Sequence, residues 1–153
     1  MATPSAYPLQ KAGQDWLLSC VTHAADAQRA WDAREFAELP SGTHWRVAEA
    51  PLSSSLQAMQ QIPTDSLGPV LADTRLSTAW WLLPPTVTDD LDDLRQITIH
   101  PVGWALESPP VLFSVRHRWW VEIPDGSGRL TDPTLLGAVF SPGAYRPERE
   151  ALA

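Results

Sequence analysis

Residues 68–85, GPVLADTRLSTAWWLLPP, contain two apolar runs that are separated by a polar turn and closed by Pro84 and Pro85. The runs, residues 69–72 and 78–83, each have the length of a β-strand. The second run is apolar on both faces, which is typical of a central strand covered on both sides. Proline cannot donate to a strand ladder, so the proline pair ends the second run. This segment is therefore predicted to be the centre of a sheet.

The chain before this segment is predicted to be mainly helical. Between residues 10 and 38, apolar side chains recur at spacings of three and four. This pattern is typical of one amphipathic helix, or of two helices with a break near residues 24–26. Residues 39–42 form a stop signal, after which a strand is expected over residues 43–50 and a short helix over residues 56–61.

The chain after the central segment is predicted to add strands and a closing helix. Strands are expected over residues 96–100, 103–108, 111–115 and 118–123, the last two forming a hairpin. A short acidic helix is expected over residues 88–95, and a final helix is expected to be capped by Thr131 or Asp132, with Pro133 in its first turn. We therefore expect an α+β fold with a mixed or antiparallel sheet, covered by an N-terminal helical layer and a C-terminal helix.

Length and composition indicate one globular domain. The chain has 153 residues, of which 44% are hydrophobic, so residues 10–145 can bury a core, and residues 1–9 and 146–153 are expected to be a flexible arm and tail. Cys20 is the one cysteine, which excludes an internal disulfide and a cysteine-based zinc site. A net charge of −7 argues against an extended duplex-binding face. No signal-peptide or membrane-span pattern is apparent, so a cytoplasmic location is expected.

No motif of recognised chemistry stands out among the polar residues. The four histidines lack metal-binding spacing and are expected at the surface or in local hydrogen bonds. Cys20 lies in an apolar helical pattern and is expected in the core. Residues 125–129, DGSGR, resemble a phosphate loop in composition, but they lack its spacing and are interpreted as a turn.

Tryptophan is unusually abundant, with eight copies. Strand alternation places Trp80 and Trp81 on opposite faces of one strand, and Trp119 and Trp120 on opposite faces of another. At least one member of each pair is therefore expected in the core. The others can be covered by helices, form a surface for a partner protein, or stack against nucleic-acid bases.

Four stretches share their order and composition with a known family. They are LPSGTHWRVAEAP at residues 39–51, WWLLPP at 80–85, ITIHPVGWALESPP at 97–110, and the Trp-containing strand at 118–124. Together they resemble the N-terminal primase-polymerase (Prim-Pol) domain of the archaeo-eukaryotic primase superfamily. The similarity is to its short actinobacterial form, labelled bifunctional DNA primase/polymerase, and it covers most of the chain.

The resemblance implies which residues would form the active site. Active members hold two divalent metal ions on a D-x-D pair and a third acid, and a histidine on a later strand contacts the nucleotide. The D-x-D positions correspond to Val47 and Glu49, the third acid falls near Thr98, and residues 77–83 contain no histidine. The resemblance therefore implies a reduced, non-catalytic relative without a metal site or cofactor, in which Glu49 is the remaining catalytic candidate.

Three functions stay open at this point. The leading one is a binding or protein-interaction domain, whose partner is another protein or a second copy of the chain. The second is a nucleotide-acting enzyme in which Glu49 works with Asp73 or Asp125 and Mg²⁺ or Mn²⁺. The third is an accessory nucleic-acid-binding module, which the net charge disfavours. The candidate binding residues are Arg46, Arg116, Arg118, Trp119 and Trp120. No membrane association is expected.

Overall fold

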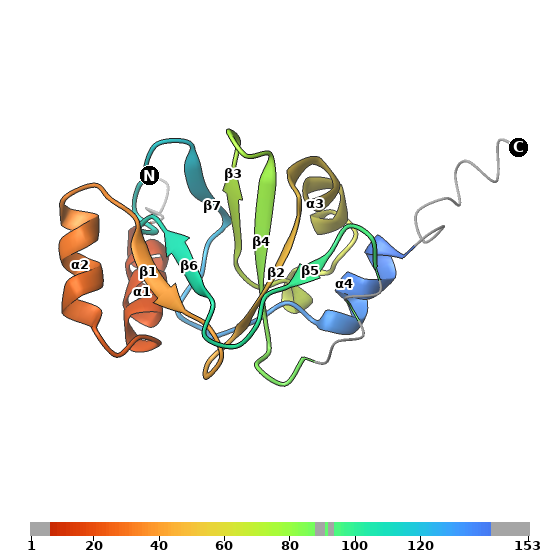
Figure 1. Cartoon of the computed structure of the whole chain (residues 1–153), viewed down its shortest axis with the longest axis horizontal. Coiled ribbons are helices and arrows are strands. Elements are labelled where there is room, and N and C mark those ends of the chain that lie inside the picture. Colours follow the sequence, from red (N-terminus) through yellow and green to blue (C-terminus); the bar gives the residue numbers. More distant parts are fainter. Residues whose placement is uncertain (1–6, 88–90, 92–93, 142–153) are drawn as a thin grey trace, which may run out of the picture.

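The computed structural model describes residues 7–87, 91 and 94–141, and it contains four named helices and two antiparallel sheets (Figure 1). The helices are α1 (Tyr7–Ser19), α2 (Ala24–Asp32), α3 (Leu52–Met59) and α4 (Pro133–Phe140), with a 3-10 turn η1 at Thr64–Ser66. The strands are β1 (Ala37–Pro40), β2 (Arg46–Pro51), β3 (Val70–Asp73), β4 (Thr78–Leu83), β5 (Thr98–Ile99), β6 (Ala105–Ser108) and β7 (Arg118–Glu122). The predicted α+β class is confirmed.

Strand β4 is the middle strand of the five-stranded sheet, whose order is β5-β2-β4-β3-β7. Its bounds are those predicted from the apolar run, and five of its six residues are buried. Trp80 and Trp81 point to opposite faces, because each belongs to a different hydrophobic core. The central position predicted for this strand is therefore confirmed.

The sheet separates two hydrophobic cores. Helices α1 and α2 and the small β1–β6 sheet lie on one side of it, and α3 and α4 lie on the other (Figure 1). The first core is centred on Leu17, Trp31, Leu71, Trp80 and Trp120. The second is centred on Val70, Trp81, Leu83, Ile97 and Leu136. Both cores depend on side chains from the same central strands, which alternate between the two faces.

The N-terminal layer differs from its prediction in three respects. Helix α1 begins at Tyr7, three residues before the expected start, and the break between the helices covers residues 20–23 rather than 24–26. The expected helix to residue 38 is wrong, because the chain is extended from Ala37 as β1. Ala37 and Leu39 are buried and Glu38 and Pro40 are exposed, and this alternation lets the segment pair with β6.

Some elements beyond the centre are also shorter or shifted. The strand expected over 111–115 is wrong apart from one bridge at Val115, since Gln14 Oε1 accepts the backbone N–H groups of Val111 and Leu112. Helix α3 starts four residues before its predicted beginning, and Ser55, within the helix, accepts a hydrogen bond from Trp81 Nε1. The predicted acidic helix and C-terminal tail lie largely outside the described residues. Within the described part of the chain, no helix has the length and apolarity to cross a membrane.

Candidate functional site

Glu49 lies on β2 between two neighbouring strands. It is opposite Trp80 of β4 on one side and Thr98 of β5 on the other. Its carboxylate atom Oε1 accepts a hydrogen bond from Trp80 Nε1 at 3.1 Å and lies 2.8 Å from His100 Nε2. An ionised carboxylate only accepts, so Nε2 is the donor when Glu49 carries its charge. Glu49 is therefore fixed by two nitrogen donors from flanking segments.

His100 is itself held in place from two directions. Its imidazole ring stacks on the Trp104 indole, with centroids 3.8 Å apart and planes 4° from parallel. Its backbone oxygen accepts two hydrogen bonds from the Arg46 guanidinium, at 3.3 and 3.0 Å. Arg46, a predicted binding residue, thus supports the Glu49–His100 pair. One sequence pattern bears on His100: it lies two residues after Thr98, so both side chains face the same side of the sheet if a strand forms there.

The residues around Glu49 do not form a divalent-metal site. Val47, at the first position of the expected acidic pair, is fully buried in the first core, and Thr98 brings no carboxylate. Trp80 contributes an N–H donor, which cannot ligate a cation. Among the described residues, no group of three or more His, Cys, Asp or Glu side chains could hold a metal ion.

A second polar contact lies on the same side of the sheet and is almost completely buried. Arg118 Nε donates to Asp73 Oδ2 at 2.9 Å, and Arg118 Nη1 donates to the Glu107 backbone oxygen at 2.7 Å. Each of the two paired side chains is 8% exposed. The guanidinium carbon lies 4.4 Å from the centroid of Trp80 and 4.6 Å from that of Phe36. The fold thus fully engages Arg118, which was expected at a binding surface.

The surroundings of Asp73 keep it ionised. Burial alone would raise the pKa of this carboxyl, but hydrogen bonds from Leu76 N–H and Arg118, together with the Arg118 charge, outweigh burial and lower the pKa. Trp80 bonds to Glu49 and also contacts the Arg118 guanidinium, so its ring lies between Glu49 and the Asp73–Arg118 pair. The two carboxylates of the enzyme hypothesis therefore each have their own partner within the fold.

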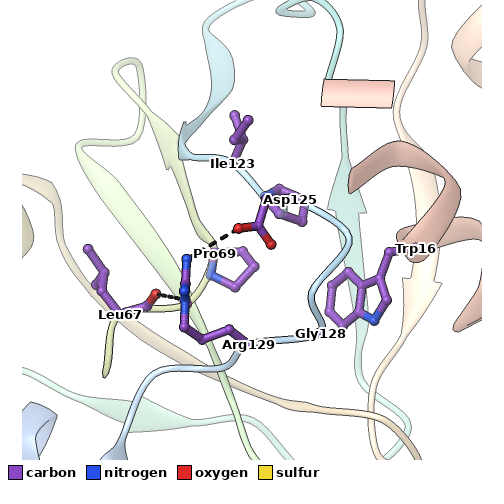
Figure 2. A pocket seen from close by; sticks show the side chains of 9 residues that line it. Trp16, Leu67, Pro69, Ile123, Asp125, Gly128 and Arg129 are labelled. Carbon is purple, nitrogen blue, oxygen red and sulfur yellow. Dashed lines mark hydrogen bonds and ion pairs between the residues drawn. The ribbon is translucent and has the colours of Figure 1, made fainter. Parts of the chain in front are cut away.

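Asp125, the other acid of the enzyme hypothesis, belongs to the turn after β7 (Figure 2). Its carboxylate accepts from Ser127 N–H at 2.9 Å and from Arg129 Nη2 at 3.2 Å. Hydrogen bonds from Ser127, and the charge of Arg129, lower its pKa. Arg129 Nε also donates to the Leu67 backbone oxygen at 3.1 Å. The adjacent cavity, of about 10 Å³, has room for about one water molecule, so this region is a structural turn.

The remaining predicted binding residues lie at or beside one surface groove. Arg116 is exposed at the turn before β7, and the half-buried Trp119 lines the groove together with Arg116. Trp120 is 5% exposed, and its Nε1 donates to the Pro109 backbone oxygen at 3.3 Å. Arg116 and Trp119 are thus brought together, whereas Arg118 and Trp120 are buried beside them.

Cys20 is half-buried against the first core, but it lies in the break after α1 and not within a helix. Burial raises the pKa of its thiol, which favours the protonated form at neutral pH. A protonated thiol is a poor nucleophile, so the arrangement gives no support to cysteine catalysis.

Comparison with known proteins gives little guidance. No protein-family model matches the chain, and no solved structure matches it. C2 domain-containing protein 3 of Mus musculus is 40% identical over 57 residues, which are 37% of this chain and 2% of that protein. The Homo sapiens protein of the same name is 39% identical over 57 residues, with the same coverage of 37% and 2%. The chain thus spans 2% of the length of these relatives, too little to show a shared family.

Proposed function

We propose that this chain is a cytoplasmic, non-catalytic, primase-polymerase-like domain that acts by binding a protein partner. The observation that carries the proposal is the pairing around Glu49. The chain positions that the resemblance relates to the nucleotide-contacting strand and to the third acid are on β4 and β5, next to Glu49 on β2. This adjacency supports the residue-by-residue comparison, because a metal site needs those positions close together.

The side chains at these positions favour binding over catalysis. Glu49 bonds to Trp80 and His100, and Val47 is packed in the core. Two-metal catalysis needs several carboxylates that can share the ions, and one carboxylate with two nitrogen donors does not supply them. Retention of a fold without its catalytic groups is the expected state of a domain that has a binding role.

A protein partner is favoured over nucleic acid by charge. The net charge of the chain is −7, whereas nucleic-acid affinity depends on neutralising phosphates with cations. Two of the three arginines expected at a nucleic-acid surface have partners within the fold: Arg46 bonds to His100, and Arg118 pairs with Asp73. Large hydrophobic side chains are exposed on helices and in turns, namely Tyr7, Leu9, Leu56, Leu76 and Val102.

The test is thermal unfolding of the full chain with MnCl₂, with a mixture of deoxynucleoside triphosphates, and with both. A ligand at 100 times its Kd stabilises a fold by about 2.7 kcal/mol. For a domain of this size that is a shift of several degrees in Tm. We expect the combination of metal and nucleotide to add no stabilisation beyond that of each component alone.

Two variants make the result specific to the site. Glu49→Gln removes the site carboxylate, and Asp65→Asn removes an exposed carboxylate elsewhere. A Tm increase that requires both metal and nucleotide, and that is lost in Glu49→Gln but kept in Asp65→Asn, would contradict the proposal and favour the nucleotide-acting enzyme.

A further inference from the structure

The groove beside Trp119 exists because a hairpin is incomplete. The arms around Arg116 and His117 pair once, where Val115 and Arg118 exchange both of their backbone hydrogen bonds. Beyond that pair, the preceding arm is bound by Gln14 of α1 and forms no ladder with β7. A groove of about 460 Å³ lies between the two arms, and its lining includes Gln10, Leu112, Phe113, Arg116, Trp119 and Trp120.

The groove runs along the outer edge of the main sheet. β7 is the last strand of that sheet, and it pairs with β3 on one side. Arg118 directs its N–H and C=O away from β3 toward Val115. Backbone groups alternate along an antiparallel strand, so Trp120, two residues further and just before the register shift between β7 and β3, presents its N–H and C=O to the same outer side. Such an edge is a template for an added strand.

The rim of the groove is cationic although the protein is acidic. Of the described residues that line it, Arg116 is positively charged and none is acidic. The Arg34 guanidinium carbon lies 4.5 Å from the centroid of Phe113, a lining residue. Local positive charge on a chain with net charge −7 selects anionic groups at this place.

Backbone conformation points to a role for these arginines. Arg34 has φ of 59° and Arg116 has φ of 54°, values that glycine or asparagine adopts more easily. Arg116 is the first of the two turn residues, where hairpins with positive φ favour glycine. Each arginine lies over a phenylalanine ring, Arg34 over Phe113 and Arg116 over Phe36. The positive φ at Arg34 and Arg116 would by itself favour glycine or asparagine at both positions.

We propose that this groove binds an extended, acidic peptide segment of the partner protein as a strand added to β7. This inference rests on the proposed function and names the chemistry of the partner. The peptide backbone bonds to the outer edge at Trp120, an apolar side chain packs on Trp119, and a carboxylate pairs with Arg116. A single-stranded nucleic acid could also use Trp119 and Arg116, but its backbone does not match the hydrogen-bonding edge of a strand.

The test adds three ligands, one at a time, to the ¹⁵N-labelled full chain and follows the amide and indole signals of the chain. They are an eight-residue peptide of alternating valine and glutamate, the matching valine–lysine peptide, and a ten-nucleotide oligo-dT. We expect the acidic peptide to shift the amide signals of β7 and the Trp119 indole signal saturably, with an affinity that falls as salt is raised. The lysine peptide should bind at least about tenfold more weakly, which corresponds to about 1.4 kcal/mol.

Arg116→Gly separates binding from folding. Glycine suits the positive φ of this turn, so the variant should keep or raise Tm while it weakens the acidic peptide about tenfold. Arg75→Gly removes the same charge from another exposed turn residue and should leave the affinity unchanged. Trp119→Ala should also weaken the peptide.

Three results would overturn the inference: no shift of β7 signals, equal binding of the two peptides, or tighter Arg116-dependent binding of oligo-dT. The last result would assign the groove to single-stranded nucleic acid. A metal-and-nucleotide response at Glu49 would instead contradict the proposed function and leave the peptide result standing, because the groove and Glu49 share no residue.

Discussion

Arg118 and Asp73 form an ion pair whose two side chains are each 8% exposed. Removing one member of a buried pair leaves the other charge without compensation, which costs about 3–5 kcal/mol. Arg118 also lies over the Trp80 and Phe36 rings and donates to the Glu107 backbone oxygen, so its charge connects β7 with β4 and β6. Among the ion pairs of the described residues, this one is the most deeply buried.

Asp73→Asn should lower the free energy of unfolding by about 3–5 kcal/mol at neutral pH. The folded-state pKa of Asp73 is lowered, and its unfolded value is about 3.9. The contribution of the charged carboxylate is therefore fully present above about pH 4, and it is lost as pH falls through the folded-state pKa. Urea unfolding at several pH values should show the wild type and Asp73→Asn converging in acid.

Asp65→Asn is the matched control, because Asp65 is exposed. It should change the free energy of unfolding by less than about 0.5 kcal/mol. A constant difference between wild type and Asp73→Asn down to the acid limit would show that the pair does not stabilise the fold through the Asp73 charge.

The partners of these residues could not be predicted from the sequence. Arg118 was expected at a binding surface, yet it pairs with Asp73, 45 residues earlier, because β3 and β7 are neighbours with these two residues in register. In the same way, His100 meets Glu49 because β5 pairs with β2. Local patterns predict which residues are polar and which face they share, whereas strand order decides which of them meet.

Among the elements, helix α1 depends on a close backbone approach at Gly13. A Cβ atom built there would lie 1.7 Å from the Pro124 backbone oxygen. Alanine has the better helix propensity by about 1 kcal/mol, but overpacking against fixed backbone costs about 1–3 kcal/mol or more. At such a short distance the clash should dominate, so Gly13→Ala should lower the free energy of unfolding by at least about 2 kcal/mol.

Gly137→Ala in α4 is the matched control. Its Cβ atom would meet Leu91 Cδ2 at 2.9 Å, which is the end of a flexible side chain that can move. We expect this substitution to be neutral or stabilising in chemical denaturation, since it gains helix propensity. Equal effects of the two substitutions would mean that α1 is not held against Pro124 as closely as the structure shows.

Elements were predictable where their signals were local. β4 has its predicted bounds because Ser77 and the Pro84–Pro85 pair interrupt the apolar run on both sides. β1 was missed because its short alternation continues an apolar pattern that resembles a helix, and its partner β6 lies far along the chain. Residues 111–115 have the apolar pattern of a strand. However, the backbone N–H groups of Val111 and Leu112 donate to Gln14 Oε1 and are not available to a strand ladder.

At the scale of the whole molecule, one sheet supplies both cores. Trp80 and Leu71 face α1 and α2, while Trp81 and Val70, their neighbours on the same strands, face α3 and α4. The α+β class and its covering helices followed from the order of local patterns. The separation into two cores followed from the two-residue period of strands that are apolar on both faces.

Because the two cores share their strands, we expect the domain to unfold in one transition. Leu17→Ala in α1 and Leu136→Ala in α4 each remove a fully buried side chain from a different core. Each should cost about 2–5 kcal/mol and lower the same urea midpoint with an unchanged m-value, whether followed by tryptophan fluorescence or by far-UV circular dichroism.

The double variant distinguishes shared from separate unfolding. Leu17 and Leu136 belong to cores on opposite faces of the sheet, so their costs should add to within about 0.5 kcal/mol in a two-state protein. If the cores unfolded separately, each single variant would instead split the transition into two, and the two probes would report different midpoints. A single transition with additive free-energy costs would mean that both cores unfold together. Destabilising either helical layer would then also destabilise β7 and its groove, through the strands common to both cores.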